Sequence, residues 1–241
     1  MANTRFAYTN MLEAATILNA PSADAAYPAA NSKNGERYIP WRSGAGPPSP
    51  VDIEFDLGSA KAVEVAALFN ISTQISSIAV ESATSGAGPW TNRATITPAG
   101  AADKGAVFAA QTFRYWRFRL TNSGQFTVGE LWISAVDADA GVIFSAGTVK
   151  SISKNRSRER NPSGVQHSFY NGRVLHAWDF LYSRATDAMR AIVETVVSQQ
   201  KSVVLIDDAS AVYQVEADDG LGWSVVFTNL QDFRIRFEEL F

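Results

Sequence analysis

Hydrophobic and polar residues alternate most strictly at the start of the segment 51–80. Three large apolar residues share one face of this stretch and three carboxylates share the other: Ile53, Phe55 and Leu57 against Asp52, Glu54 and Asp56. A period of two is typical of a half-buried strand. We expect Gly58 to end that strand. The apolar run 62–70 is too short and too β-branched for a helix, and Ile75–Val80 predicts a further strand, so we predict three adjacent strands of a β-sandwich.

The same alternation returns in the segment 114–120. Trp116, Phe118 and Leu120 are predicted to face the core, with Arg117 and Arg119 facing outward. A turn over 121–124 leads into a predicted strand at 127–134. Residues 20–50 contain six prolines and predict a long irregular segment, which its aromatic residues mark as an ordered loop.

These patterns together resemble the discoidin, or coagulation-factor type C, family. The resemblance lies in Trp41-Arg42, the apolar-acidic strand that ends in the D-L-G of 56–58, the aliphatic run after it, and the R-Y-W-R-F-R-L of 114–120. It covers about Ala20 to Ile133, roughly half of the chain. It implies a jelly-roll sandwich of the galactose-binding-like type. The chain has no cysteine, so it lacks the disulfide of many extracellular members.

The second half of the chain predicts a small antiparallel β-domain with one helix. Strand-like pieces at 165–170 and 173–180 flank Asn171-Gly172, a strong hairpin signal. Apolar residues at helical spacing predict a helix over about Ser183–Gln200. Further strands are predicted at 142–152, 203–206, 211–216, 223–227 and 232–240. The small and acidic stretch 135–141 marks the boundary, so we predict a sandwich domain at 1–137 and an α+β domain at 138–241 in a mainly β protein.

The layout of the second half resembles minor tail proteins of long-tailed bacteriophages, which join a tail tube to a baseplate. This resemblance implies a virion structural protein that is made in the host cytoplasm, a homo-oligomeric ring of three- or six-fold symmetry, and other tail or baseplate proteins as partners. The sandwich adds a possible partner, a cell-surface glycan. The leading hypothesis is therefore a tail-tip component. The alternative is a carbohydrate-binding adhesion protein, and a hydrolase is a distant third.

Composition and charge narrow the function classes. The net charge of −3 is spread over both halves, which argues against binding to nucleic acid through bulk charge. The absence of cysteine excludes thiol catalysis and thiolate zinc sites. The N-terminus lacks the pattern of a secretory signal, and no apolar run is long enough for a membrane span, so we expect a soluble chain without a membrane segment.

We find no concentrated set of catalytic residues, and we expect neither enzyme activity nor a cofactor or metal. No nucleophile, zinc or phosphate-loop motif is present. His167 and His176 could face each other across the predicted hairpin, but two ligands are too few for a zinc site. The acidic pairs at 207–208 and 218–219 fit turns better than a calcium loop.

Two sets of residues remain as candidate binding sites. Loops of the predicted sandwich carry aromatic and polar residues that could stack on sugar rings and fix hydroxyl groups: Tyr27, Tyr38, Arg42, Trp90 and Arg93. Trp41 is expected to plug the core instead. The second set is a basic stretch with a single acid, predicted as a mobile arm that contacts an acidic neighbouring subunit and not as a nucleic-acid site: Lys150, Lys154, Arg156, Arg158 and Arg160.

Overall fold

A computed structural model describes residues 5–21, 23–100, 103–139, 149–160, 166–185, 191, 194–196, 203–206, 212–217, 222–227 and 230–239. The chain divides into two compact units. The first unit consists of Met1–Asp139 together with Val204–Tyr213, and the second of Ala140–Val203 together with Gln214–Phe241. Residues 204–206, which the predicted boundary assigns to the second domain, group with the first unit by their contacts.

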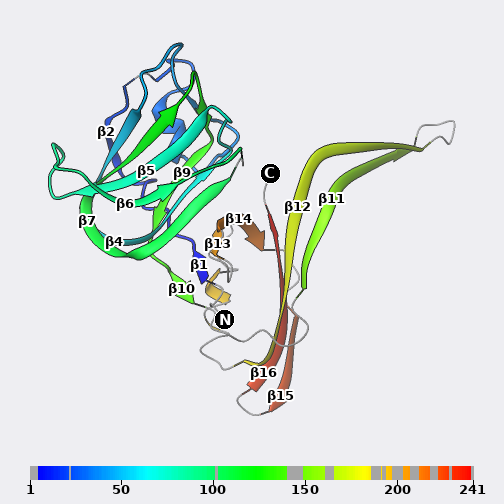
Figure 1. The fold of residues 1–241 in the computed structure, drawn as a ribbon. Helices are drawn as coiled ribbons and strands as arrows, with labels where there is room; N and C mark the ends of the chain where they lie inside the picture. The colour runs from blue at the N-terminus through cyan, green and yellow to red at the C-terminus, as the bar shows by residue number, and fades with distance from the viewer. Residues whose placement is uncertain are drawn as a thin grey trace. The chain divides into compact units, whose positions relative to one another are not determined.

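Two long antiparallel strands, β4 (Val51–Phe69) and β7 (Lys104–Asn122), form the frame of the first unit (Figure 1). Their register slips between Asp56 and Lys61, where Gly58 has a φ of +79°, a left-handed conformation that suits glycine. The prediction that Gly58 ends a strand is therefore wrong: β4 bends there and continues. Residues 51–69 form one bent strand, not two.

The bend lets one pair of strands serve both layers of a sandwich. One sheet has the order β2-β4-β7-β5-β6, with β2 (Thr16–Asn19), β5 (Ile75–Ala83) and β6 (Thr91–Ile96). The second half of β4 pairs with β9 (Glu130–Ser134), and β3 (Trp41–Arg42) pairs with β8 (Thr127–Val128). The predicted mainly β fold with an N-terminal sandwich is confirmed.

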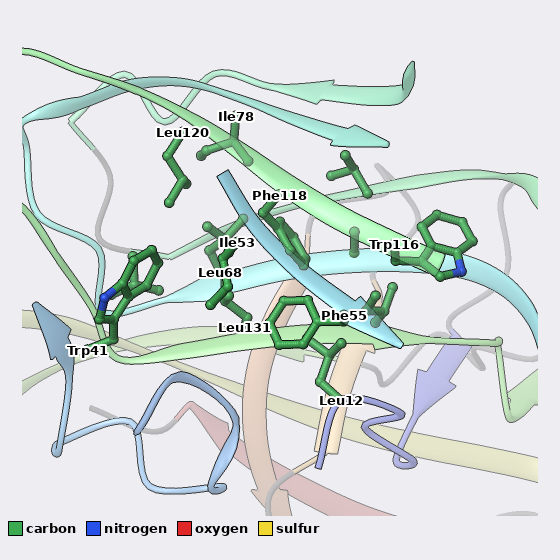
Figure 2. Packing of buried hydrophobic residues seen from close by; sticks show 14 of the residues in the cluster. Leu12, Trp41, Ile53, Phe55, Leu68, Ile78, Trp116, Phe118, Leu120 and Leu131 are labelled. Atoms are coloured by element: carbon green, nitrogen blue, oxygen red, sulfur yellow. The ribbon is translucent and has the colours of Figure 1, made fainter. Parts of the chain in front are cut away.

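The core lies between the inner faces of the two halves of the β4–β7 pair. Trp116, Phe118 and Leu120 are fully buried, as their alternation predicts. Trp41 is also fully buried and meets Phe126 edge-to-face at 5.4 Å between ring centroids, which confirms its expected role as a plug. Figure 2 shows Trp41 and Trp116 on opposite sides of the packed group.

The continuous apolar run of 62–70 is explained by burial on both of its faces. Val63 and Leu68 belong to the sandwich core. Val65, Ala67 and Phe69 pack on the other side with four further residues: Ala7, Trp132, Val204 and Ile206. The last two come from β13 (Val203–Ile206), which pairs with β1 (Arg5–Ala7), and β1 in turn pairs with β10 (Ala138–Asp139). A strand covered on both faces has no polar face, so it shows no alternation.

The second unit is antiparallel around β12 (Gln166–Ala185). It pairs on one side with β11 (Val149–Arg160) and on the other with β16 (Leu230–Glu239). β14 (Val212–Ala217) and β15 (Gly222–Phe227) both pair with β16. Residues 191 and 194–196 are helical. The predicted α+β arrangement is confirmed, and the predicted strands of 203–240 recur with small shifts of their ends.

Three predictions for the second unit are wrong in detail. Asn171-Gly172 lies inside β12, where the register slips from the pair Lys154↔Val174 to the pair Arg156↔Tyr170. The dipeptide thus forms a bulge, and the chain reverses between Arg160 and Gln166 instead. The basic stretch, predicted as a mobile arm, is part of a strand that pairs with β12.

The shifted register also separates the two histidines, since His167 pairs with Glu159 and His176 with Ile152. The predicted helix start is wrong as well: β12 extends to Ala185, beyond Ser183. The remainder of the predicted helix, apart from 191 and 194–196, lies outside the described residues, as do residues 142–148 of the predicted strand at 142–152.

Candidate functional site

The structure places the predicted sugar-contacting residues at two different ends of the sandwich. Tyr27, Tyr38 and Arg42 lie on the irregular segment 23–43, which is bonded to residues 126–128 next to the start of β5. Trp90 and Arg93 lie beside the end of β5 and the bend of β4. We call these the loop end (residues 23–43, 70–74 and 121–129) and the bend end (residues 57–61, 84–93 and 113–115).

The register of β5 against β7 gives the separation of the two ends. Ile75 pairs with Asn122, and Ala83 pairs with Tyr115. Eight strand residues at about 3.3 Å each separate the two pairs by roughly 26 Å. One small ligand cannot contact both ends, so the predicted residues fall into two separate groups.

At the loop end, a buried arginine fixes the base of the irregular segment. The side chain of Arg37 is 3% exposed, and its Nη2 donates hydrogen bonds to both carboxylate oxygens of Asp103 at 2.7 Å. Oδ1 of Asp103 also accepts a hydrogen bond from the backbone N of Asn70 at 2.7 Å. The guanidinium lies 5.6 Å from the ring centroid of Phe69. This largely buried ion pair ties the segment to the end of β4 and the start of β7.

The backbone of Gly129 packs closely against the backbone of Arg37 and against Asn70. A Cβ at this position would lie 2.3 Å from the carbonyl oxygen of Arg37 and 2.8 Å from Cβ of Asn70. Asn70 has a φ of +52° and donates from Nδ2 to the same carbonyl oxygen at 3.1 Å. Only glycine permits this close approach of two backbones.

The sequence analysis missed Arg37, Asp103, Asn70 and Gly129. The glycine inside the predicted strand 127–134 was the one available signal, because such a glycine often marks a close approach.

The tip of this segment exposes two apolar side chains. Tyr38 is 64% exposed and Ile39 is 46% exposed. The backbone N of Ile39 donates to the carbonyl oxygen of Glu36 at 3.0 Å, which closes a turn. Nδ2 of Asn31 donates to the carbonyl oxygen of Pro40 at 3.2 Å. The turn and the anchored base present the Tyr38 ring to solvent on a fixed backbone.

Four residues after Tyr38 along the chain, Arg42 lies over a second tyrosine, Tyr27. Its guanidinium carbon is 4.1 Å from the ring centroid of Tyr27. Nε and Nη2 donate to Oδ2 of Asp24 at 3.0 and 2.6 Å. The backbone N–H of Ala26 and the Arg42 guanidinium hold the pKa of the Asp24 carboxyl below its ordinary value. Both charged groups remain partly exposed, so they can exchange hydrogen bonds with a polar ligand.

At the bend end, the predicted residues are engaged in packing with other side chains. The guanidinium of Arg117 lies 4.7 Å from the ring centroid of Trp90 and bonds Glu81. Arg93 lies 4.5 Å from the ring centroid of Phe113 and donates from Nε to Oγ of Ser82 at 2.8 Å. Trp90 and Arg93 are thus parts of the outer sheet surface, and each already has a stacking partner.

The described residues contain no cluster suited to a metal ion, since no three His, Cys, Asp or Glu side chains among them converge. Of the residues that the structure describes, none belong to a helix long and apolar enough to cross a membrane. The loop end offers one exposed ring, Tyr38, and one partly exposed ion pair, Arg42–Asp24.

Comparison with known proteins gives structural matches only. No family model matches the chain, and no curated protein matches it. Similar solved structures include chitosan-binding module 1 of a chitosanase/glucanase from Paenibacillus sp. IK-5, at 25% identity over 53% of this chain and 100% of that one, with a TM-score of 0.46. Another is CBM32-3 from a family 31 glycoside hydrolase of Clostridium perfringens, at 16% identity over 53% and 94%, with a TM-score of 0.45.

A third is CBM32-5 of the same organism in complex with GalNAc-β-1,3-galactose, at 13% identity over 53% and 100% of the two chains, with a TM-score of 0.47. All three are carbohydrate-binding modules. The similarity covers about half of this chain.

Proposed function

We propose that the first unit is a carbohydrate-binding module whose ligand sits at the loop end and stacks on Tyr38. The observation that carries this proposal is the exposure of the Tyr38 ring on a turn whose base is held by the buried Arg37–Asp103 pair. An exposed aromatic ring is costly to leave in water and offers a flat apolar face. A pyranose ring presents a matching patch of C–H groups.

The rigid base supports binding because little conformational freedom remains to be lost. Association costs about 0.5–1.5 kcal/mol for each flexible side chain that it immobilises, and more for a flexible loop. Here Asp103, Asn70 and Gly129 already fix the backbone next to Tyr38.

Arg42 and Asp24 supply the polar part of the site. Their paired head groups are partly exposed and offer both donors and acceptors, which sugar hydroxyl groups require. Tyr27 already has the Arg42 guanidinium on one face, so its role is to hold Arg42 in place. Ring contacts by Tyr38 would give affinity, and the Arg42–Asp24 pair would give orientation.

The experiment compares three variants of the full chain against a panel of immobilised polysaccharides. Tyr38→Ala should lower the affinity at least about tenfold, a loss of about 1.4 kcal/mol, while the melting temperature stays within error, because the side chain is exposed. Tyr115→Ala at the bend end is the matched control and should bind as the wild type does. Trp90→Ala tests the other end. Loss of binding in Trp90→Ala with full binding in Tyr38→Ala would refute the proposed location.

A structural role of the second unit in tail assembly stays a prediction from the sequence.

A further inference from the structure

The distal part of the β11–β12 pair is a two-stranded ribbon. β12 pairs with β16 only over residues 177–185, whereas its pairing with β11 extends to Arg160↔Gln166. Figure 1 shows β11 and β12 continuing together past β16. We call residues 154–160 and 166–174 the distal ribbon. In the described part of the chain, its two strands pair only with each other. A two-stranded hairpin is marginally stable by itself in water, so such a ribbon gains stability from a partner.

The register gathers three of the five basic residues of the distal ribbon on one face. Arg156, Arg158 and Arg160 occupy alternate positions of β11, and alternate positions of a strand share a face. Their cross-strand partners are uncharged: Tyr170, Ser168 and Gln166. The only acid of the ribbon, Glu159, falls on the opposite face, opposite His167. In the linear sequence Glu159 lies among these arginines, whereas the strand register places the three arginines on one face and Glu159 on the other.

Charge is segregated between this ribbon and the remainder of the chain. Residues 154–174 contain five basic residues and one acidic residue, a net charge of +4. The whole chain carries −3, so the remainder carries −7. We call the remainder of the chain the acidic body; the basic ribbon of one copy and the acidic body of another carry opposite net charge and are complementary.

We propose that the arginine face of the distal ribbon docks on the acidic body of a second copy of this chain. The contact is head-to-tail, since the ribbon of one copy and the body of the next are different surfaces. Such a contact makes a ring where the rotation closes and a filament where it does not. This inference goes beyond the proposed sugar site and does not depend on it. A polyanion such as duplex DNA is the competing occupant, and the negative charge of the chain opposes it.

The test is sedimentation of the full chain over a range of micromolar concentrations, at low and at high salt. The wild type should associate, and salt should weaken the association, because charge pairs at an interface are screened. The variant Arg156→Ser/Arg158→Ser/Arg160→Ser should associate at least about tenfold more weakly. The matched control, Lys33→Ser/Lys61→Ser/Lys104→Ser, removes the same charge from the first unit and should behave as the wild type.

A mixing experiment separates the head-to-tail contact from a general loss of folding. The arginine variant keeps its acidic body, so it should still accept the ribbon of the wild type and, in excess, cap assemblies at a smaller mass. A wild type that stays monomeric at all concentrations would overturn the proposal. Equal weakening by the lysine control, or no capping by the arginine variant, would do the same. Salt-dependent retardation of duplex DNA by the wild type, lost in the arginine variant, would assign the face to nucleic acid instead.

Discussion

Ile206 provides the sharpest test of how the sandwich is completed. This residue follows the body of the sandwich by almost seventy positions, yet it is fully buried against the outer face of β4, next to Phe69 and Trp132. Ile206→Ala removes three carbons, and at about 0.8 kcal/mol each the lost transfer free energy is about 2.4 kcal/mol. The cavity that remains adds to this loss, so we expect a destabilisation of about 3 kcal/mol, within the usual range for such changes.

Hydrogen exchange under native conditions is the suitable assay, because it reports on each segment separately. Amides of 62–69 and 130–134 should exchange faster in Ile206→Ala by a factor that matches about 3 kcal/mol. Ile39→Ala is the matched control: it makes the same change at an exposed site and should alter the free energy of unfolding by less than about 0.5 kcal/mol. If the protection of 62–69 is the same in Ile206→Ala as in the wild type, β13 does not complete the first unit.

Three further predictions concern the same unit. Phe118→Ala should cost about 3–5 kcal/mol in urea unfolding, as a large-to-small change in a packed core; a loss below about 1 kcal/mol would mean that the side chain is not in the core. A fragment of residues 1–138 should unfold cooperatively but at lower urea than the sandwich of the intact chain, because it lacks β13; equal midpoints would contradict this. Arg42→Ala should raise the pKa of Asp24 towards its ordinary value of 3.8 in an NMR titration. Because that pKa is depressed in the folded state, the carboxylate stabilises the fold above about pH 4 and loses this effect as the pH falls through the folded pKa; an unchanged pKa would show that Arg42 has no part in the shift.

Local periodicity was sufficient to predict the inner face of the first sheet. Trp116 and Phe118 alternate with arginines, and this alternation predicts that the apolar residues face the core, where both are buried. The same rule could not interpret 62–70, because the strand that covers its outer face comes from 203–206. A contact over such a distance in the sequence leaves no periodic signal, so it could not be found from one chain.

Turn signals were less reliable than periodicity. Gly58 and Asn171-Gly172 both allow the backbone to leave the regular strand conformation, and a reversal is only one way of doing so. In the structure one marks a bend of β4 and the other a bulge of β12. Whether the chain bends, bulges or reverses at such a position depends on the neighbouring strands with which it pairs, and the local sequence does not specify those strands.

The candidate site was predicted in part. Tyr38 and Arg42 were chosen as aromatic and polar loop residues, and both lie at the loop end, where they are partly or largely exposed. Trp90 and Arg93 were chosen by the same criterion, but they lie at the other end of the sandwich. The criterion could not separate the two groups, because residue type does not reveal at which end of a strand a loop lies. The supporting pair Arg37–Asp103 was invisible, since its members are 66 residues apart.

The most direct test of the central claim is the location of a bound sugar on the first unit. Amide chemical shifts of the isotope-labelled full chain are recorded during titration with an oligosaccharide that the polysaccharide panel identifies as a ligand. We predict that the largest changes fall on residues 36–42, with smaller changes around Asp24, and that residues 84–93 are unaffected. Changes concentrated at 84–93, with 36–42 unaffected, would contradict the assignment of the site to the loop end.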